Sequence, residues 1–317
     1  MNEIAAYILE VVFIPALIAT VFAGLFLLRP LRRRSWLVEA GVASGLALAF
    51  LLSFVAELDW RAVARQVVTI EGDDAPFERW HRLGLSALVL IALAWGMSLR
   101  RRLVPVAHGM LATLGIAVVA ALLAGFFVRY PGSTVLIQCL QGLLVFASIA
   151  LWALTNQGVL WSAWVVFGVL GALCALGGFA SLAVMCGAVS VAGFGMASVA
   201  AVLGRGSPRP EPVRPHGAIP IVLGALTALI ARCGMVYDTA GTSPAVWTAA
   251  ALLPAGSLFF SRRFRDAVRP AAKTFWSWIG VALLGAALLG YVAGSQAFKG
   301  GPASGESDDD LADMYGG

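Results

Sequence analysis

Residues 4–34 read IAAYILEVVFIPALIATVFAGLFLLRPLRRR. Up to Leu28 the only charge in this stretch is Glu10, and the run is long enough to cross a hydrocarbon core of about 30 Å as an α-helix. A basic cluster follows at once, with Arg29, Arg32, Arg33 and Arg34. An apolar run that ends in a basic cluster predicts a transmembrane helix whose carboxyl end faces the cytoplasm.

The composition of the whole chain predicts the same class of protein. Of its 317 residues, 60% are hydrophobic and 12% are charged, and the mean hydropathy is +0.87. These values are typical of a chain solvated by lipid. Since only helices satisfy their own backbone groups in lipid at this sequence period, the predicted fold is an all-α polytopic bundle. Ten transmembrane helices are expected at about 4–28, 36–57, 83–99, 103–128, 134–155, 158–177, 179–203, 218–237, 246–260 and 274–297.

The charges between these spans alternate from loop to loop. Arginine clusters follow the first, third, seventh and ninth expected spans, and most acidic residues fall on the other side. By the positive-inside rule the arginine-rich side is cytoplasmic, so both termini are expected outside a cell inner (plasma) membrane. The sequence pI of 9.3 reflects these arginines, which suit membrane lipids as partners, and no nucleic acid is expected.

Two polar segments divide the chain. Residues 205–217 contain four prolines and predict an extended connection between a seven-helix and a three-helix portion of the membrane domain at 1–298. Residues 299–317 are rich in Gly, Ser and Asp and predict a disordered acidic tail outside. Protein partners are expected either at this tail or at glycine-rich spans such as 274–297, where small residues let helices approach closely.

Polar residues inside the spans are few and therefore informative. Glu10 and Arg232 each lie roughly 8–9 Å below the outer ends of their spans, and thus in the same leaflet. Gln138 and Gln141 enter the fifth span from that side, one helical turn apart. Together these four residues predict a substrate-binding polar pocket open to the outside, with Glu10 and Arg232 as its charged pair. In the alternative, Arg232 extends toward Asp238, while Glu10 is protonated or reaches the interface.

The sequence shows no motif for catalysis or for cofactor binding. Only His108 of the three histidines lies in an expected span, so the paired ligands of a membrane haem are missing. No HExxH, GxSxG or P-loop spacing occurs. The four cysteines have no CxxC spacing and are expected to pack as small apolar side chains. We therefore expect a non-enzymatic protein with no catalytic residue, no cofactor and no metal.

Two functions agree with this pattern. The first is a carrier for a small solute that binds in the polar pocket. The second is a non-catalytic membrane subunit or scaffold of a larger envelope complex, because the centre of the membrane is uncharged. A carrier should enclose a hydrated cavity, whereas a scaffold should pack its interior dry and expose a small-residue face.

A minor alternative rests on acidic residues in an early outer loop, where they could hold a metal or act as a base. This placement resembles that in membrane glycosyltransferases that use lipid-linked sugars. The residues are Glu57, Asp59, Asp73 and Asp74.

Overall fold

The computed structural model describes residues 3–28, 31, 34–58, 82–103, 135–155, 158–204, 217–258 and 270–299. All regular secondary structure in these ranges is helical, as predicted. Seven helices are long and apolar enough to cross a membrane, which is the architecture of a multi-pass membrane protein. They are Glu3–Leu27, Ser35–Glu57, Arg82–Leu99, Val159–Leu176, Ala180–Leu203, Ala218–Tyr237 and Trp278–Ala297.

The first span consists of three consecutive helical pieces. These are α1 (Glu3–Ile8), the π-helical turn η1 (Leu9–Phe13) and α2 (Ile14–Leu27). Pro15 stands in the first turn of α2, directly after the π-helical turn. A proline has no N–H to donate within a continuous helix, and a local π-helical turn is one way in which membrane helices accommodate it. The next span, α4 (Ser35–Glu57), packs against both η1 and α2.

Four helices follow in the middle of the chain, namely α6 (Arg82–Leu103), α8 (Val135–Leu154), α9 (Val159–Leu176) and α10 (Ala180–Gly204). The last two are antiparallel neighbours joined by a tight turn at Gly177 and Gly178, the junction between the spans expected at 158–177 and 179–203. Gly178 has a φ of +81°, a conformation that residues with a side chain rarely adopt. The N–H of Phe179 then donates to the carbonyl of Cys174 at 2.8 Å, which closes the end of α9.

Toward the end of the chain lie α11 (Ala218–Tyr237), α12 (Pro244–Ala251) and α14 (Pro270–Lys299). The expected ninth span at 246–260 is not one continuous helix. It breaks into α12, a turn at 252–254 and a short helical segment at 255–258. Pro254 explains the break, because a proline has no N–H for the helix and its ring clashes with the carbonyl four residues earlier.

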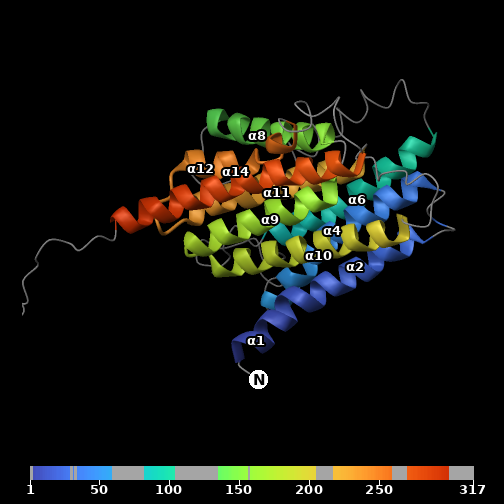
Figure 1. Cartoon of the computed structure of the whole chain (residues 1–317), viewed down its shortest axis with the longest axis horizontal. Helices are drawn as coiled ribbons and strands as arrows, with labels where there is room; N and C mark the ends of the chain where they lie inside the picture. Colours follow the sequence, from blue (N-terminus) through green and yellow to red (C-terminus); the bar gives the residue numbers. More distant parts are fainter. Residues whose placement is uncertain are drawn as a thin grey trace, which may run out of the picture.

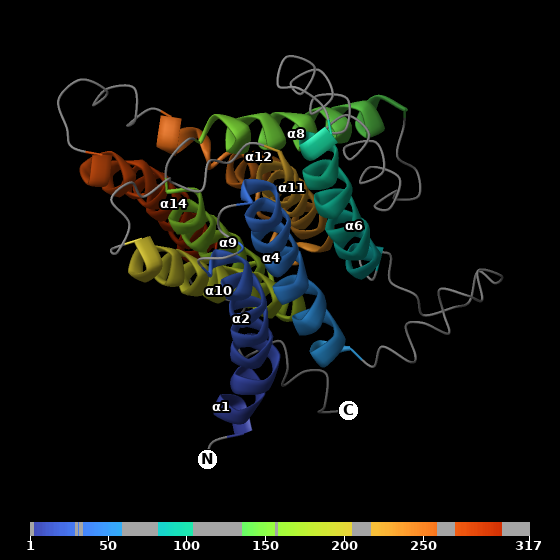
Figure 2. The same ribbon diagram turned by 90° about the vertical axis from the view of Figure 1, so that its right-hand side faces the viewer.

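The helices run roughly side by side, with α1 and α2 along one edge of the bundle and α8 along the opposite edge (Figure 1). A view at right angles shows α1 extending away from the other helices toward the amino terminus (Figure 2). The central helix is α11, which packs against α4, α6, α8, α9 and α12. Of the residues in the most apolar part of its span, 83% are buried, whereas the corresponding share for the span in α14 is 22%.

One end of the bundle, which we call the Glu57 end, gathers the start of α1 and the ends of α4, α9 and α14. Tyr7 and Ser181 both donate hydrogen bonds to Glu57 there. Nearby, the Gln296 side chain donates to the carbonyl of Leu176 at 3.3 Å. This is the end that the arginine pattern places outside.

The expected number of ten spans is supported only in part. The expected span at 103–128 lies outside the described residues beyond 103, as do the connection at 205–216 and the tail beyond 299. In α8, the segment Cys139–Leu154 forms a shorter apolar helix. Within the described ranges, length and composition therefore support seven spans.

Candidate functional site

Two of the four predicted pocket residues are in contact. Arg232 on α11 and Gln141 on α8 face each other across the α8–α11 interface. With the Gln141 amide oxygen turned toward the guanidinium, it accepts hydrogen bonds from Nη2 at 2.7 Å and from Nε at 3.0 Å. Nη1 of Arg232 lies 3.0 Å from the sulfur of Met235. A partly buried guanidinium is thereby fixed in position by neighbours on two helices.

The other two predicted residues lie elsewhere or outside the described side chains. Gln138 is one turn before Gln141 on α8, but its side chain is not among those described. Glu10 is exposed on η1, and η1 packs against α4 and α10 at the edge of the bundle. Among the hydrogen bonds and ion pairs of the described residues, none joins Glu10 to Arg232. Equal depth in the membrane did not bring these two charges together.

Gln141→Leu should weaken the α8–α11 contact. It removes the acceptor of two hydrogen bonds from a charged group, and we expect a loss of about 1–2 kcal/mol in the free energy of unfolding. Unfolding by dodecyl sulfate in mixed micelles, followed by tryptophan fluorescence, measures this change. In a double-mutant cycle with Arg232→Met the two losses should not add, and additive losses would contradict the contact.

Sequence reasoning missed a polar cluster at the Glu57 end. The Glu57 carboxylate accepts a hydrogen bond from Tyr7 on α1 through Oε2 and from Ser181 on α10 through Oε1, the latter at 2.7 Å. Glu57 was predicted to be a loop acid, but it forms the last residue of α4 and links three helices. The other three acids of that loop, Asp59, Asp73 and Asp74, lie outside the described residues, so the glycosyltransferase pattern stays a prediction.

A second cluster surrounds Asp238, directly after α11. Its carboxylate accepts hydrogen bonds from the backbone N–H groups of Ala240 at 2.9 Å and Thr242 at 2.7 Å, and from the Trp247 indole at 3.1 Å. This geometry is an Asx turn that also holds a buried tryptophan of α12. In the alternative prediction, Arg232 extends toward Asp238. The guanidinium would then have to compete with these three donors for the carboxylate oxygens.

Glu39 lies at the opposite end of the bundle, one turn into α4. Its side chain is only 4% exposed, and its Oε2 lies beside Gly217, the residue that precedes α11. A carboxylate near the amino end of a helix is favoured by the helix dipole. This position fits an anchor between α4 and α11 rather than a binding site.

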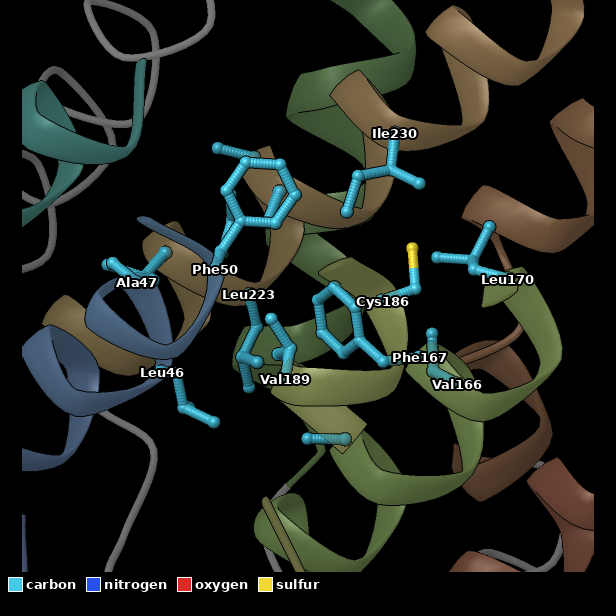
Figure 3. Close-up of a cluster of buried hydrophobic side chains, with 14 of the residues drawn as sticks. Leu46, Ala47, Phe50, Val166, Phe167, Leu170, Cys186, Val189, Leu223 and Ile230 are labelled. Atoms are coloured by element: carbon cyan, nitrogen blue, oxygen red, sulfur yellow. The ribbon is translucent and has the colours of Figure 1, made fainter. Parts of the chain in front are cut away.

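Apolar side chains fill the centre of the bundle. In Figure 3, residues from α4, α9, α10 and α11 point toward a common space, among them Phe50, Phe167, Val189 and Leu223. Each of these four side chains is 0% exposed. Buried polar groups between α8 and α11 satisfy each other, since the Trp152 indole donates to the Thr227 hydroxyl at 3.4 Å. Among the described helices, this region is thus packed like a core.

Acidic residues, histidines and cysteines do not gather into a metal site in the described ranges. No group of three or more His, Cys, Asp and Glu residues there could hold a metal ion. Cys174, Cys186 and Cys233 are buried free thiols, and Cys139 is an exposed one. The three buried thiols agree with the prediction of small side chains that pack between helices, whereas the exposed Cys139 does not.

No protein-family model matches this chain, and no curated protein is significantly similar to it. The class of the protein is therefore defined by the architecture of its described residues, which are all-helical and contain seven helices that can cross a membrane.

Proposed function

We propose that this protein is a non-catalytic subunit of a larger membrane assembly, in a cell inner membrane. The observation that carries the proposal is the contrast between a closed interior and an open glycine-bearing face on α14. The centre where α4, α9, α10 and α11 meet is packed with apolar side chains (Figure 3). A carrier needs a polar path between helices, and packing of this kind leaves the function to the outer surface.

The open face of α14 supports contact with another helix. The buried side of this helix, at Val281, Gly285 and Val292, packs toward the bundle. On another side small residues recur every four positions at Ala286, Gly290 and Gly294, and a Cβ added at either glycine would meet nothing within 4 Å.

Glycine four residues from glycine is the spacing at which membrane helices approach most closely. A helix backbone left bare in this way fits a second helix better than it fits lipid chains, since packing rather than hydrophobicity drives association within a bilayer. In a cell inner membrane, the arginine pattern of the loops would orient the chain with its arginine-rich side toward the cytoplasm.

The carrier remains the second candidate because of the Arg232–Gln141 contact. Arg232 provides N–H donors and Gln141 provides an acceptor oxygen. Arg232 lies about five residues, or roughly 8 Å, before the end of α11 that is nearest to Glu57. A small anion could be bound there, but the apolar packing deeper in the bundle gives it no described polar path.

The double substitution Gly290→Leu and Gly294→Leu tests the assembly role. Two leucines would cover the bare backbone, and we expect the fraction of chain in the native complex to fall about tenfold, which corresponds to about 1.4 kcal/mol. Blue-native electrophoresis of gently solubilised membranes measures this fraction. Gly142→Leu is the matched control, because a Cβ at this glycine of α8 also meets nothing within 4 Å. Equal complex in all three proteins would contradict the proposed use of α14.

A further inference from the structure

Glu10 occupies an unusual position on the outside of a membrane-crossing helix. The turn η1 directs two consecutive valines inward, since Val11 is 2% and Val12 is 8% exposed. The two residues before these valines, Leu9 and Glu10, and the two after them, Phe13 and Ile14, are exposed. The buried valines fix the rotation of the helix against α4 and α10, so the carboxylate faces away from the bundle.

The depth of Glu10 makes this exposure costly. Glu10 lies seven residues after the first residue of the span at Glu3, or about 10 Å along the helix. It is also one turn deeper than Tyr7, whose hydroxyl reaches Glu57 at the end of α4. A carboxylate that faces hydrocarbon is unfavourable unless it has a hydrogen-bonding or ionic partner. Within the described part of the chain, Glu10 has neither.

Apolar residues continue from Glu10 as a regular seam along α2. The exposed residues Ile14, Leu17 and Val21 follow at steps of four, three and four. Leu17 is 63% and Val21 is 57% exposed. This is the spacing with which helices pack side by side at a crossing angle of about 20°. Lipid could cover the apolar part of such a seam equally well, but not the carboxylate.

We propose that the Glu10 seam binds a transmembrane helix of another protein that carries a basic residue in the leaflet at the Glu57 end. This inference rests on the proposed role as an assembly subunit, and it names the chemistry of one partner. Charge complementarity selects that partner, because an arginine or lysine at the depth of Glu10 would neutralise the carboxylate and donate hydrogen bonds to it. The leucine and valine side chains of α2 would supply the adjoining packing surface.

A second copy of this chain is a poor occupant of the same seam. Two copies related by a twofold axis would bring one Glu10 toward the other, and two carboxylates at close range repel each other. The chain's own intramembrane Arg232 already contacts Gln141 and Met235 on the inner side of the bundle.

The test uses designed helices in vesicles of phosphatidylcholine. The probe is a leucine–alanine transmembrane peptide with one arginine seven residues from each end, so that either orientation presents an arginine near the depth of Glu10. A second peptide has leucine at these two positions. Energy transfer between the labelled peptide and the full-length protein, labelled at its amino terminus before α1, reports association.

We expect the wild-type protein to bind the arginine peptide about tenfold more tightly than the leucine peptide. This preference should persist in Glu10→Asp, weaken in Glu10→Gln and disappear in Glu10→Leu. Glu3→Gln is the matched control, since Glu3 is an exposed acid at the end of the same span. The proposal is overturned if the wild type shows no preference, if Glu10→Leu keeps it, or if Glu3→Gln also loses it.

Two results separate binding at the Glu10 seam from the proposed assembly role. If a native complex with other membrane proteins keeps its composition in Glu10→Leu, the assembly role stands and the Glu10 seam is not the contact. If the native protein is found alone while the arginine preference depends on Glu10, the seam binds as inferred and the assembly role fails.

Discussion

Gly224→Ala is expected to destabilise the bundle by about 3 kcal/mol, although alanine is the better helix former by about 1 kcal/mol. A Cβ at Gly224 would lie 2.5 Å from Cα and 2.6 Å from the backbone N of Ile149 on α8. Backbone atoms cannot turn aside as a side chain can, so α8 and α11 would have to separate. Because α11 lies at the centre of the bundle, that separation would disturb several helices at once.

The measurement is unfolding by dodecyl sulfate in mixed micelles, and Gly290→Ala serves as the control. Gly290 lies in a helix of similar hydropathy but has open space around it, so alanine there should be neutral or slightly stabilising. If both variants shifted the unfolding midpoint by the same amount, the close approach of α8 to α11 would be wrong.

Asp238→Ala is the second substitution with a large expected effect, again about 3 kcal/mol. It removes the acceptor of three hydrogen bonds and leaves the indole N–H of Trp247 unpaired, in a side chain that is 1% exposed. The turn between α11 and α12 also loses the group that organises it. Trp247 packs directly against the bare backbone of Gly234 on α11, so disorder in this turn should spread into the central helix.

Two controls separate the parts of this effect. Trp247→Phe removes the indole N–H and part of the ring volume but leaves both backbone hydrogen bonds to Asp238, so the turn should stay organised. Asp238→Asn keeps one carbonyl oxygen and should be intermediate between the wild type and Asp238→Ala. Protease accessibility of the turn, together with the unfolding midpoint, reports the result. An Asp238→Ala protein as stable as the wild type would show that the carboxylate does not organise the turn.

Hydropathy predicted the positions of most helices well. The span expected at 218–237 coincides with α11, and the predicted junction at Gly177–Gly178 is the turn between α9 and α10. These predictions succeed because a bilayer sets the length of a span and a glycine pair permits a sharp turn. The ninth span was wrong as a single helix, and the position of Pro254 in its middle was the signal for the break.

The site could be predicted less well, because depth along a helix says nothing about which helices are neighbours. Glu10 and Arg232 were expected to pair since both lie near one end of their spans. The structure places η1 at an edge of the bundle and α11 at its centre, and neither the lateral order of membrane helices nor the π-helical turn follows from hydropathy. The Gln141–Arg232 contact was within reach of the prediction, whereas Glu57 was missed because a helix end resembles a loop in sequence.

The most direct test of an assembly role is the intact mass of the wild-type protein, purified gently at its native expression level, with identification of every chain that accompanies it. The proposal predicts stoichiometric membrane proteins of unrelated sequence, at least one with a basic residue inside a span. A lone monomer, or a homodimer without other chains, would contradict it and would direct the next experiments to solute binding at Arg232 and Gln141.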